Sequence, residues 1–349
     1  MSKIVMLMTA AAGAALFLSC SFTRAAEDPR DSDSPFGVLA FVAWDHDWNK
    51  FHFGGDKVER GAALMKEAGI RFVRMDFLWA DIEPRQNEFD FAKYDRIVET
   101  LTRYDIKILG LLEYTPPWAD KRWNAPPDPA LYVKFATAVV KHYKDKIKYW
   151  EIWNEPDSPT YWGPQDDMKT YTLLLKAVYP ALKKEDPTCK ILMGGIADTY
   201  SIRLKQIYKS GGKDYFDIVN IHPFMDPLMP NAIGMVRNAY RGIYKQMEAY
   251  DDAHKEIWLT ELGCPGVVTP TRENGWWQGM SPTEHEQAEW VETVYTKCLE
   301  WKGVKKVFWA FFRDTPGHFK NGVDYFGLVR DDFSKKPAFE AYKKKAASR

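Results

Sequence analysis

The feature that most constrains the fold is a regular alternation of short apolar runs with amphipathic segments along almost the whole chain. Strand-like runs are predicted at residues 36–42, 70–77, 106–112, 149–154, 191–193, 216–221, 257–260 and 307–312. Helix-like segments are predicted at residues 57–68, 91–104, 129–144, 168–184, 202–209, 232–250, from 281 onward and at 337–345. Strands that alternate with helices in this way predict a parallel sheet covered by helices.

Eight such repeats in about 315 residues predict a single-domain (β/α)8 TIM barrel with long loops. A doubly wound open sheet is the structural alternative. It is disfavoured because no glycine-rich phosphate-binding turn follows the first strand, and the Gly-Gly pairs of the chain lack the required spacing.

One helix start has a specific signature. Ser281, Pro282, Thr283 and Glu284 predict a capping box with proline at the first helical position.

Composition excludes some classes of function. The chain has 349 residues, 46% of them hydrophobic, and its formal net charge is zero. This content suffices for a large core, and the absence of a basic stripe argues against a nucleic-acid partner. Aromatic residues make up 15% of the chain, which permits stacking on sugar rings without proving it.

The N-terminus predicts export from a bacterial cell. Lys3 is the only charge before an apolar run at residues 4–22, and small residues follow, so residues 1–26 are interpreted as a cleavable signal peptide. The alternative is a lipoprotein signal in which Cys20 carries the lipid, the only membrane contact expected. Residues 27–34 would then be a short polar tether to a domain at 35–349. The protein would be secreted, periplasmic or membrane-anchored.

The cysteines predict no disulfide framework. Three of the four, Cys189, Cys264 and Cys298, remain after removal of the signal, and an odd number favours buried thiols. No cysteine or histidine pair has the spacing of zinc ligands, so no metal site is predicted.

Two glutamates follow two of the predicted strands. The fourth strand ends in Asn154-Glu155-Pro156, and the seventh ends at Glu261. Active sites of such barrels lie at the C-terminal ends of the strands. Glycoside hydrolysis requires two carboxyl groups there, one to protonate the leaving oxygen and one to attack the sugar or activate water. Period-two alternation predicts two same-face groups, namely Ile257, Leu259 and Glu261, and Glu151, Trp153 and Glu155.

These residues resemble clan A retaining glycoside hydrolases. The likeness covers nearly the whole chain from Phe36 and is greatest to glycoside hydrolase family 39, with family 5 second. It rests on Asn154-Glu155-Pro156 and Glu261, and the supporting segments are residues 115–119, 150–156, 283–288, 326–328 and 336–338. The resemblance implies β-linked glycosides as substrates, Glu155 as acid/base and Glu261 as nucleophile. This chemistry requires no metal or organic cofactor.

The resemblance also suggests roles for two polar residues. Asn154 would form a hydrogen bond with the sugar 2-OH, and Arg74 would lie beside the nucleophile and keep it ionised. For Arg74, a core ion pair with Asp76 or Glu151 is the alternative.

The end of the sixth strand departs from the clan pattern. His222 matches a clan histidine, but Phe224 stands where a tyrosine hydroxyl usually orients the nucleophile. Tyr200 and Tyr325 are candidates to replace that hydroxyl, or else His222 and Arg74 suffice.

Further residues are predicted to contact sugar. Trp309 matches the clan tryptophan under the reacting ring, and Trp118, Trp276 and Trp277 occur in loop-like sequence. Glu113, at the end of the third strand, would bind a substrate hydroxyl or pair with Lys121 or Arg122.

Two other functions use the same features. A non-catalytic glycan-binding protein could share this fold, and a transglycosylase would use the same residues with a different acceptor. The sequence does not specify the sugar, the linkage, or endo or exo action.

Overall fold

The computed structural model describes residues 34–46, 53–163, 168–198, 200–277 and 279–348. Residues Ser34–Arg349 form one compact unit. The predicted signal peptide, Cys20 and all but the last residue of the predicted tether lie outside the described residues. In the described part of the chain, no helix is both long and apolar enough to cross a membrane.

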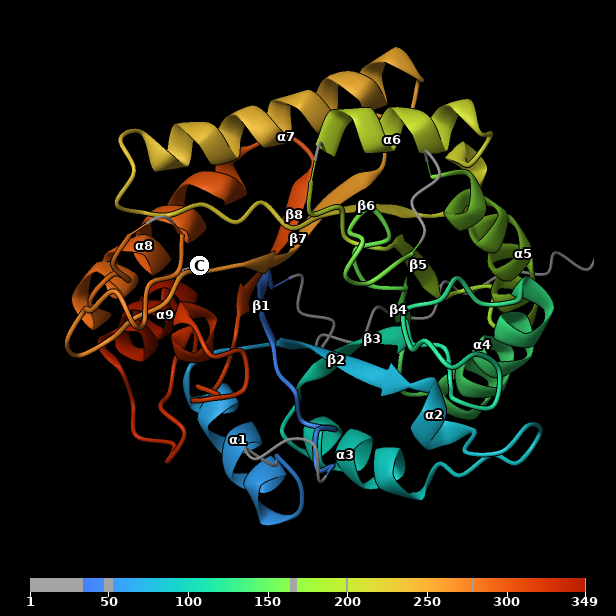
Figure 1. Cartoon of the computed structure of the whole chain (residues 1–349), viewed down its shortest axis with the longest axis horizontal. Coiled ribbons are helices and arrows are strands. Elements are labelled where there is room, and N and C mark those ends of the chain that lie inside the picture. The colour runs from blue at the N-terminus through green and yellow to red at the C-terminus, as the bar shows by residue number, and fades with distance from the viewer. Residues whose placement is uncertain (1–33, 47–52, 164–167, 199, 278, 349) are drawn as a thin grey trace, which may run out of the picture. The chain divides into compact units, whose positions relative to one another are not determined.

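The strands form a closed parallel barrel in the order β1 to β8. Their bounds are Phe36–Leu39 (β1), Phe72–Leu78 (β2), Lys107–Glu113 (β3), Tyr149–Ile152 (β4), Lys190–Met193 (β5), Ile218–Ile221 (β6), Glu256–Leu262 (β7) and Val304–Ala310 (β8). Figure 1 shows β1 beside β8, where Phe36–Leu39 pair in register with Val307–Ala310 and close the barrel. The predicted TIM barrel is therefore confirmed, and the open sheet is excluded.

Helices surround the barrel (Figure 1). The α-helices are Asp56–Glu67 (α1), Trp79–Ile82 (α2), Ala92–Arg103 (α3), Pro129–Tyr143 (α4), Lys169–Glu185 (α5), Tyr200–Lys209 (α6), Ala232–Ala249 (α7), Glu284–Lys297 (α8) and Pro337–Ala347 (α9). In the part of the chain that the structure describes, the short 3-10 helices are Lys213–Tyr215 (η1), Cys298–Glu300 (η2) and Gly322–Tyr325 (η3). Among the described residues, the short α2 after β2 is the one α-helix beyond those expected.

The strands are buried on both faces, as expected for a parallel barrel. Outward-facing strand residues pack against the helices in a large outer core. Inside the barrel, a lower layer is apolar and consists of Phe72, Leu109, Leu192, Ile218, Trp258 and Phe308. The layer above it is polar and carries the candidate site.

The capping box of α8 is present, but two residues later than predicted. Thr283 is the N-cap, its hydroxyl accepts from the Glu286 backbone N–H, and the Glu286 carboxylate accepts from the Thr283 backbone N–H. Pro282 therefore precedes the cap and is not the first helical residue. The S/T-x-x-E pattern fits both positions, and the structure uses the second.

Candidate active site

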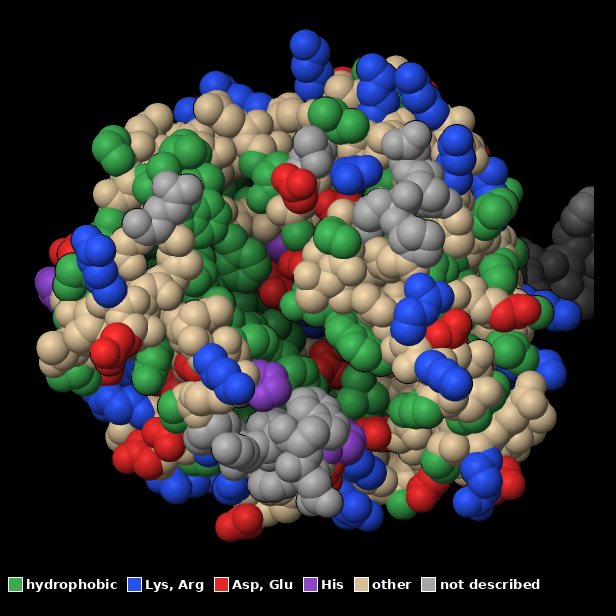
Figure 2. All heavy atoms as spheres, viewed as in Figure 1, with side chains coloured by type: hydrophobic (Ala, Val, Ile, Leu, Met, Phe, Trp, Pro, Cys, Tyr) green, Lys and Arg blue, Asp and Glu red, His purple; other side chains and the backbone are tan. Residues whose placement is uncertain are grey.

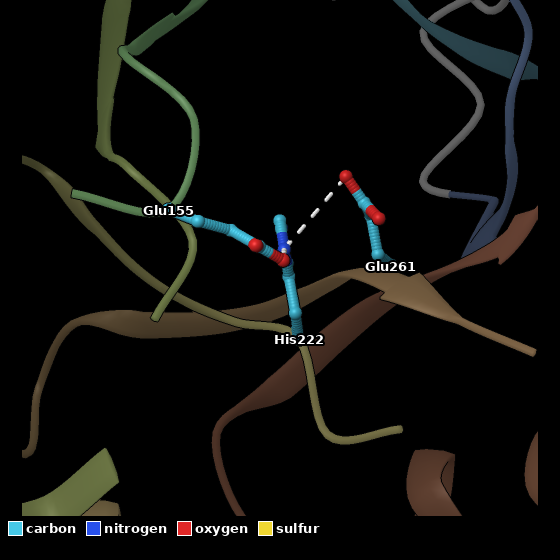
Figure 3. Close-up of side chains that lie close together, drawn as sticks. All are labelled: Glu155, His222 and Glu261. Carbon is cyan, nitrogen blue, oxygen red and sulfur yellow. Dashed lines mark hydrogen bonds and ion pairs between the residues drawn. The ribbon is translucent and has the colours of Figure 1, made fainter. Parts of the chain in front are cut away.

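Glu155 and Glu261 approach each other at the C-terminal mouth of the barrel. Figure 3 shows the two side chains coming from opposite sides, with His222 between them. One atom from each of the three residues lies within 4.8 Å of the other two. Each glutamate side chain is only 12% exposed. Figure 2 shows a hollow over the middle of the barrel, with hydrophobic side chains on one wall and acidic ones at its floor.

Glu155 reaches this position because the chain turns sharply after β4. The strand stops at Ile152, two residues earlier than predicted, and Trp153 and Glu155 have left-handed φ values of 68° and 40°. These turns separate residues that were predicted to share a face. Trp153 packs into the outer core and donates its Nε1–H to the Tyr161 carbonyl at 2.9 Å, whereas Glu155 faces the barrel axis.

Glu261 reaches this position because β7 contains a bulge. Leu259 pairs with Val307 and Leu262 with Trp309, so three steps along β7 oppose two steps along β8. The extra residue breaks the period-two pattern. Ile257 and Leu259 therefore face the outer core while Glu261 faces the site, and the prediction that the three share a face was wrong.

Arg74 links the nucleophile candidate to the barrel interior. Its Nη1 donates to Glu261 Oε1 at 2.7 Å, and its Nε and Nη2 donate to the two Glu151 oxygens at 2.7 and 2.9 Å. Arg74 therefore lies beside Glu261 and also forms a buried ion pair with Glu151, which are the two positions expected for it. The planar guanidinium allows this shared geometry, which a lysine could not reproduce.

Asn154 is held by the same guanidinium. Arg74 Nη2 donates to Asn154 Oδ1 at 2.8 Å. Because the amide oxygen accepts this bond, the amide nitrogen is the group of Asn154 that can donate to a ligand hydroxyl. This orientation agrees with the role expected for Asn154.

The two carboxyl groups have different electrostatic environments. Burial raises the pKa of Glu155 to about 7, with Arg74 acting against this rise and Glu151 adding to it. Burial also raises the pKa of Glu261, and the positive charge of Arg74 acts against this rise. Because Arg74 donates directly to Glu261 and not to Glu155, Glu261 is the better candidate for the ionised partner.

His222 bridges the site. Its Nδ1 lies 2.8 Å from Glu155 Oε1 and 3.7 Å from Glu261 Oε1, and its Nε2 lies 2.9 Å from Thr260 Oγ1. The ring is fully buried, and burial lowers its pKa. His222 thus lies between the two candidate carboxyl groups.

Phe224 contributes a ring where the clan has a hydroxyl. It packs 5.8 Å from Phe326, in an aromatic wall completed by Leu39, Phe41, Trp276, Ala310, Phe311, Phe319 and Val323. The Tyr200 hydroxyl donates to the His222 carbonyl at 3.4 Å. Burial, followed by the charges of Glu155 and Glu261, raises the pKa of Tyr161, so Tyr161, which was not predicted, lies close enough to the site to be affected by its charges.

The predicted tryptophans occupy different environments. Trp309 lies in the outer core, is fully buried, and donates to the Phe326 carbonyl at 2.9 Å, so in this conformation it does not face the hollow. Trp276 belongs to the aromatic wall, and Trp277 is 44% exposed beside it. Trp118 is partly buried and donates to the Glu83 carbonyl at 2.7 Å.

Glu113 is buried beside Asp76 at the ends of β3 and β2. Burial, followed by the charge of Asp76, raises the pKa of Glu113 well above its usual range. The alternative of pairing with Arg122 is not observed, because Arg122 forms its ion pair with Asp120 at 3.5 Å. Glu113 is therefore a buried acid near the site.

A second aromatic cluster was missed. Tyr114, Trp123 and Tyr161 lie on the loops that follow β3 and β4, with Tyr114 4.9 Å from Trp123 and 6.2 Å from Tyr161. Trp123 is 49% exposed, and its carbonyl accepts from the Thr115 backbone N–H at 3.1 Å. The available signal was the aromatic content of two loops that follow strands of the site.

Among the described residues, Glu155, His222 and Glu261 are the one cluster with spacing suited to a metal ion. Their facing atoms already engage one another and Arg74. A bound cation would lie next to the guanidinium that donates to Glu261. The donor set therefore fits proton sharing better than metal ligation, and we assign no metal site.

Known sequences match parts of this chain. The glycoside hydrolase family 42 model, described as β-galactosidase, matches residues 47–123. A 6-phospho-β-glucosidase from Clostridium longisporum is 32% identical over 105 residues, which are 27% of this chain and 22% of that protein. Endo-1,4-β-xylanase B from Thermotoga neapolitana is 24% identical over 285 residues, 75% of this chain and 76% of that protein. The first of these relatives is thus matched over about a fifth of its length.

Known structures match nearly the whole chain. A family 39 glycoside hydrolase from Bacteroides cellulosilyticus WH2 superposes with a TM-score of 0.70 at 22% identity, over 90% of this chain and 64% of that one. The structure of GH5_18 from Streptomyces cattleya superposes with a TM-score of 0.70 at 14% identity, over 90% of this chain and 80% of that one. The two structures superpose equally well on this chain, and the resemblance to clan A is confirmed at the level of the fold.

Proposed function

We propose that the protein is a retaining β-glycoside hydrolase in which Glu261 is the nucleophile and Glu155 the acid/base. The observation that carries this proposal is the pair of carboxyl groups, with facing oxygens within 4.8 Å, in unlike electrostatic environments. Retaining enzymes hold their carboxyl groups roughly 5–5.5 Å apart, whereas inverting enzymes need roughly 6.5–9.5 Å for a water molecule. The short separation supports retention.

In the first step, a Glu261 carboxylate oxygen attacks the anomeric carbon as the bond to the leaving oxygen breaks. Glu155 gives its proton to that oxygen, and a covalent glycosyl-enzyme forms. The bond from Arg74 favours the ionised form of Glu261, and the Asn154 amide nitrogen is oriented to donate to the sugar 2-OH.

In the second step, water attacks the anomeric carbon and gives a proton to Glu155, while Glu261 departs as a carboxylate. Glu155 thus acts first as acid and then as base. A pKa of about 7 suits both roles near neutral pH.

The expected substrate is a β-linked glycoside or polysaccharide. Support comes from the matched β-glycosidases and from the aromatic surfaces on both sides of the carboxyl pair. We place leaving-group sugars beside Tyr114, Trp123 and Tyr161, because Tyr161 lies on the loop that carries Glu155.

The first experiment measures reducing-end release from a panel of β-glycans and aryl β-glycosides. Glu261→Gln and Glu155→Gln should lose nearly all turnover of the glycans, while the control Glu256→Gln, at the opposite end of β7, should retain it. Equal rates for wild type and Glu261→Gln would contradict the proposal.

Azide rescue distinguishes the two roles. With an activated aryl β-glycoside, Glu261→Gly plus azide should yield the α-glycosyl azide, and Glu155→Ala plus azide the β-glycosyl azide. The reverse assignment would exchange the two products. A glycan-binding protein would give neither product, and a transglycosylase would transfer the sugar to an added acceptor faster than to water.

We also propose that the protein is exported through its N-terminal segment. The support is the sequence pattern at residues 1–26. Mass spectrometry of the mature chain from a bacterial host should find either cleavage near Ala26 or a lipid on Cys20. An intact Met1 would contradict both forms of the proposal.

A further inference from the structure

A continuous chain of hydrogen bonds runs behind His222. Asn220 Nδ2 donates to Glu151 Oε1 at 2.9 Å, and Thr260 Oγ1 lies 2.8 Å from Asn220 Oδ1. His222 Nε2 follows at 2.9 Å from Thr260 Oγ1, and His222 Nδ1 ends the chain 2.8 Å from Glu155 Oε1. All members except Glu155 are fully buried.

The direction of each bond follows from counting donors and acceptors. Glu151 forms a bidentate ion pair with Arg74, so its oxygens only accept. Asn220 must therefore present its nitrogen to Glu151 and its oxygen to Thr260, because the flipped amide would place two acceptors together. The single Thr260 hydroxyl proton then goes to Asn220 Oδ1.

This leaves only lone pairs of Thr260 Oγ1 facing His222, so Nε2 must carry a hydrogen. A neutral imidazole with Nε2–H has a lone pair on Nδ1. That lone pair points at Glu155 Oε1, and the proton between the two atoms belongs to Glu155.

We propose that Asn220 and Thr260 are positioning residues that fix His222 as the Nε2–H tautomer, so that Nδ1 accepts a hydrogen bond from protonated Glu155. The catalytic meaning of this device rests on the proposed function, but the tautomer itself does not. In the opposite tautomer, Nδ1–H would donate to the Glu155 carboxylate, favour its ionised form and lower its pKa, so that less of Glu155 would carry the proton that a general acid must give.

The electrostatics agree with this arrangement. Burial lowers the pKa of His222 and raises that of Glu155 to about 7, so burial favours the neutral ring and the protonated acid. The titratable groups that act on this pair from the surrounding elements are Arg74, Glu151, Asp157, Tyr161, Tyr200 and Glu261.

The test is nitrogen NMR of protein labelled with 15N-histidine, with the His222 signals identified by their loss in His222→Ala. At pH 6, wild type should show a protonated Nε2 and an unprotonated Nδ1. Thr260→Ser, which keeps the hydroxyl, should show the same pattern. Thr260→Val, which keeps the shape but removes the acceptor, should move the hydrogen to Nδ1.

A wild-type spectrum with hydrogen on Nδ1, or an unchanged pattern in Thr260→Val, would overturn the proposal. If Thr260→Val fails to fold, Asn220→Ala replaces it, because a Thr260 hydroxyl without Asn220 is free to donate to Nε2. These readouts need no substrate, so they are independent of the proposed function.

Activity gives a second readout if wild type hydrolyses a β-glycoside. The apparent pKa of the basic limb of its kcat/KM–pH profile should fall by about one unit in Thr260→Val. Thr260→Ser should have the wild-type value. An unshifted limb in Thr260→Val would overturn the catalytic part of the proposal. Absence of turnover by wild type would instead contradict the proposed hydrolase.

Discussion

Replacing Glu155 by glutamine should make the protein more stable at alkaline pH. The pKa of Glu155 rises from its ordinary value of 4.5 to about 7 because folding buries the carboxyl group. A group with a raised pKa stabilises the fold fully below its unfolded pKa, and that contribution is lost as pH rises through the folded pKa. Wild type should therefore lose stability between about pH 4.5 and 7.

The size of the loss follows from the pKa difference. Each pKa unit corresponds to about 1.4 kcal/mol, so a rise from 4.5 to about 7 corresponds to about 3 kcal/mol. Glutamine cannot ionise, and its NH2 group can donate to His222 Nδ1 as protonated Glu155 does. Glu155→Gln should match wild type near pH 4.5 and exceed it by about 3 kcal/mol at pH 8.

The assay is thermal unfolding of both proteins across this pH range. For a unit the size of Ser34–Arg349, the unfolding entropy is about 0.7 kcal/mol/K, so the expected gain in Tm at pH 8 is about 5 °C. Glu256→Gln, an exposed glutamate at the start of β7, is the matched control and should follow wild type. A constant Tm difference between Glu155→Gln and wild type from pH 4.5 to 8 would refute the reasoning.

Three further outcomes are expected. The kcat/KM profile should fall above about pH 7, because Glu155 must carry a proton to act as acid, and a profile flat to pH 9 would contradict its role. Arg74→Lys should lower kcat/KM about a hundredfold, since one ammonium cannot donate to Glu151, Asn154 and Glu261 together. Wild-type values of kcat/KM for this variant in steady-state kinetics would contradict this expectation. Trp123→Ala should raise KM for oligosaccharides about tenfold and leave short aryl glycosides unaffected, and an equal effect on both would exclude a leaving-group platform.

The sequence by itself determined the barrel and the two candidate glutamates. A chain with eight apolar runs separated by amphipathic segments can adopt few folds other than a closed parallel sheet covered by helices. Once that fold is assumed, Glu155 and Glu261 follow strands and must lie at the same mouth. These conclusions need only local spacing and the polarity of the chain.

Only the tertiary structure decided how individual side chains face. Period-two alternation gave wrong faces in β7, because the bulge there depends on pairing with β8. It also gave wrong faces after β4, because the turns there place non-glycine residues in left-handed backbone conformations. Trp309 also lies in the outer core, although the resemblance implied a place under the sugar.

The hydrogen-bond chain from Glu151 to Glu155 was likewise beyond the sequence. Its members come from β4, β6 and β7 and from the loops that follow them, and their separations along the chain range from 38 to 69 residues. No local sequence pattern indicates which of these residues donates each hydrogen bond and which accepts it. Barrel closure brings these residues together in a buried layer where every donor must find an acceptor, and that requirement sets the state of His222.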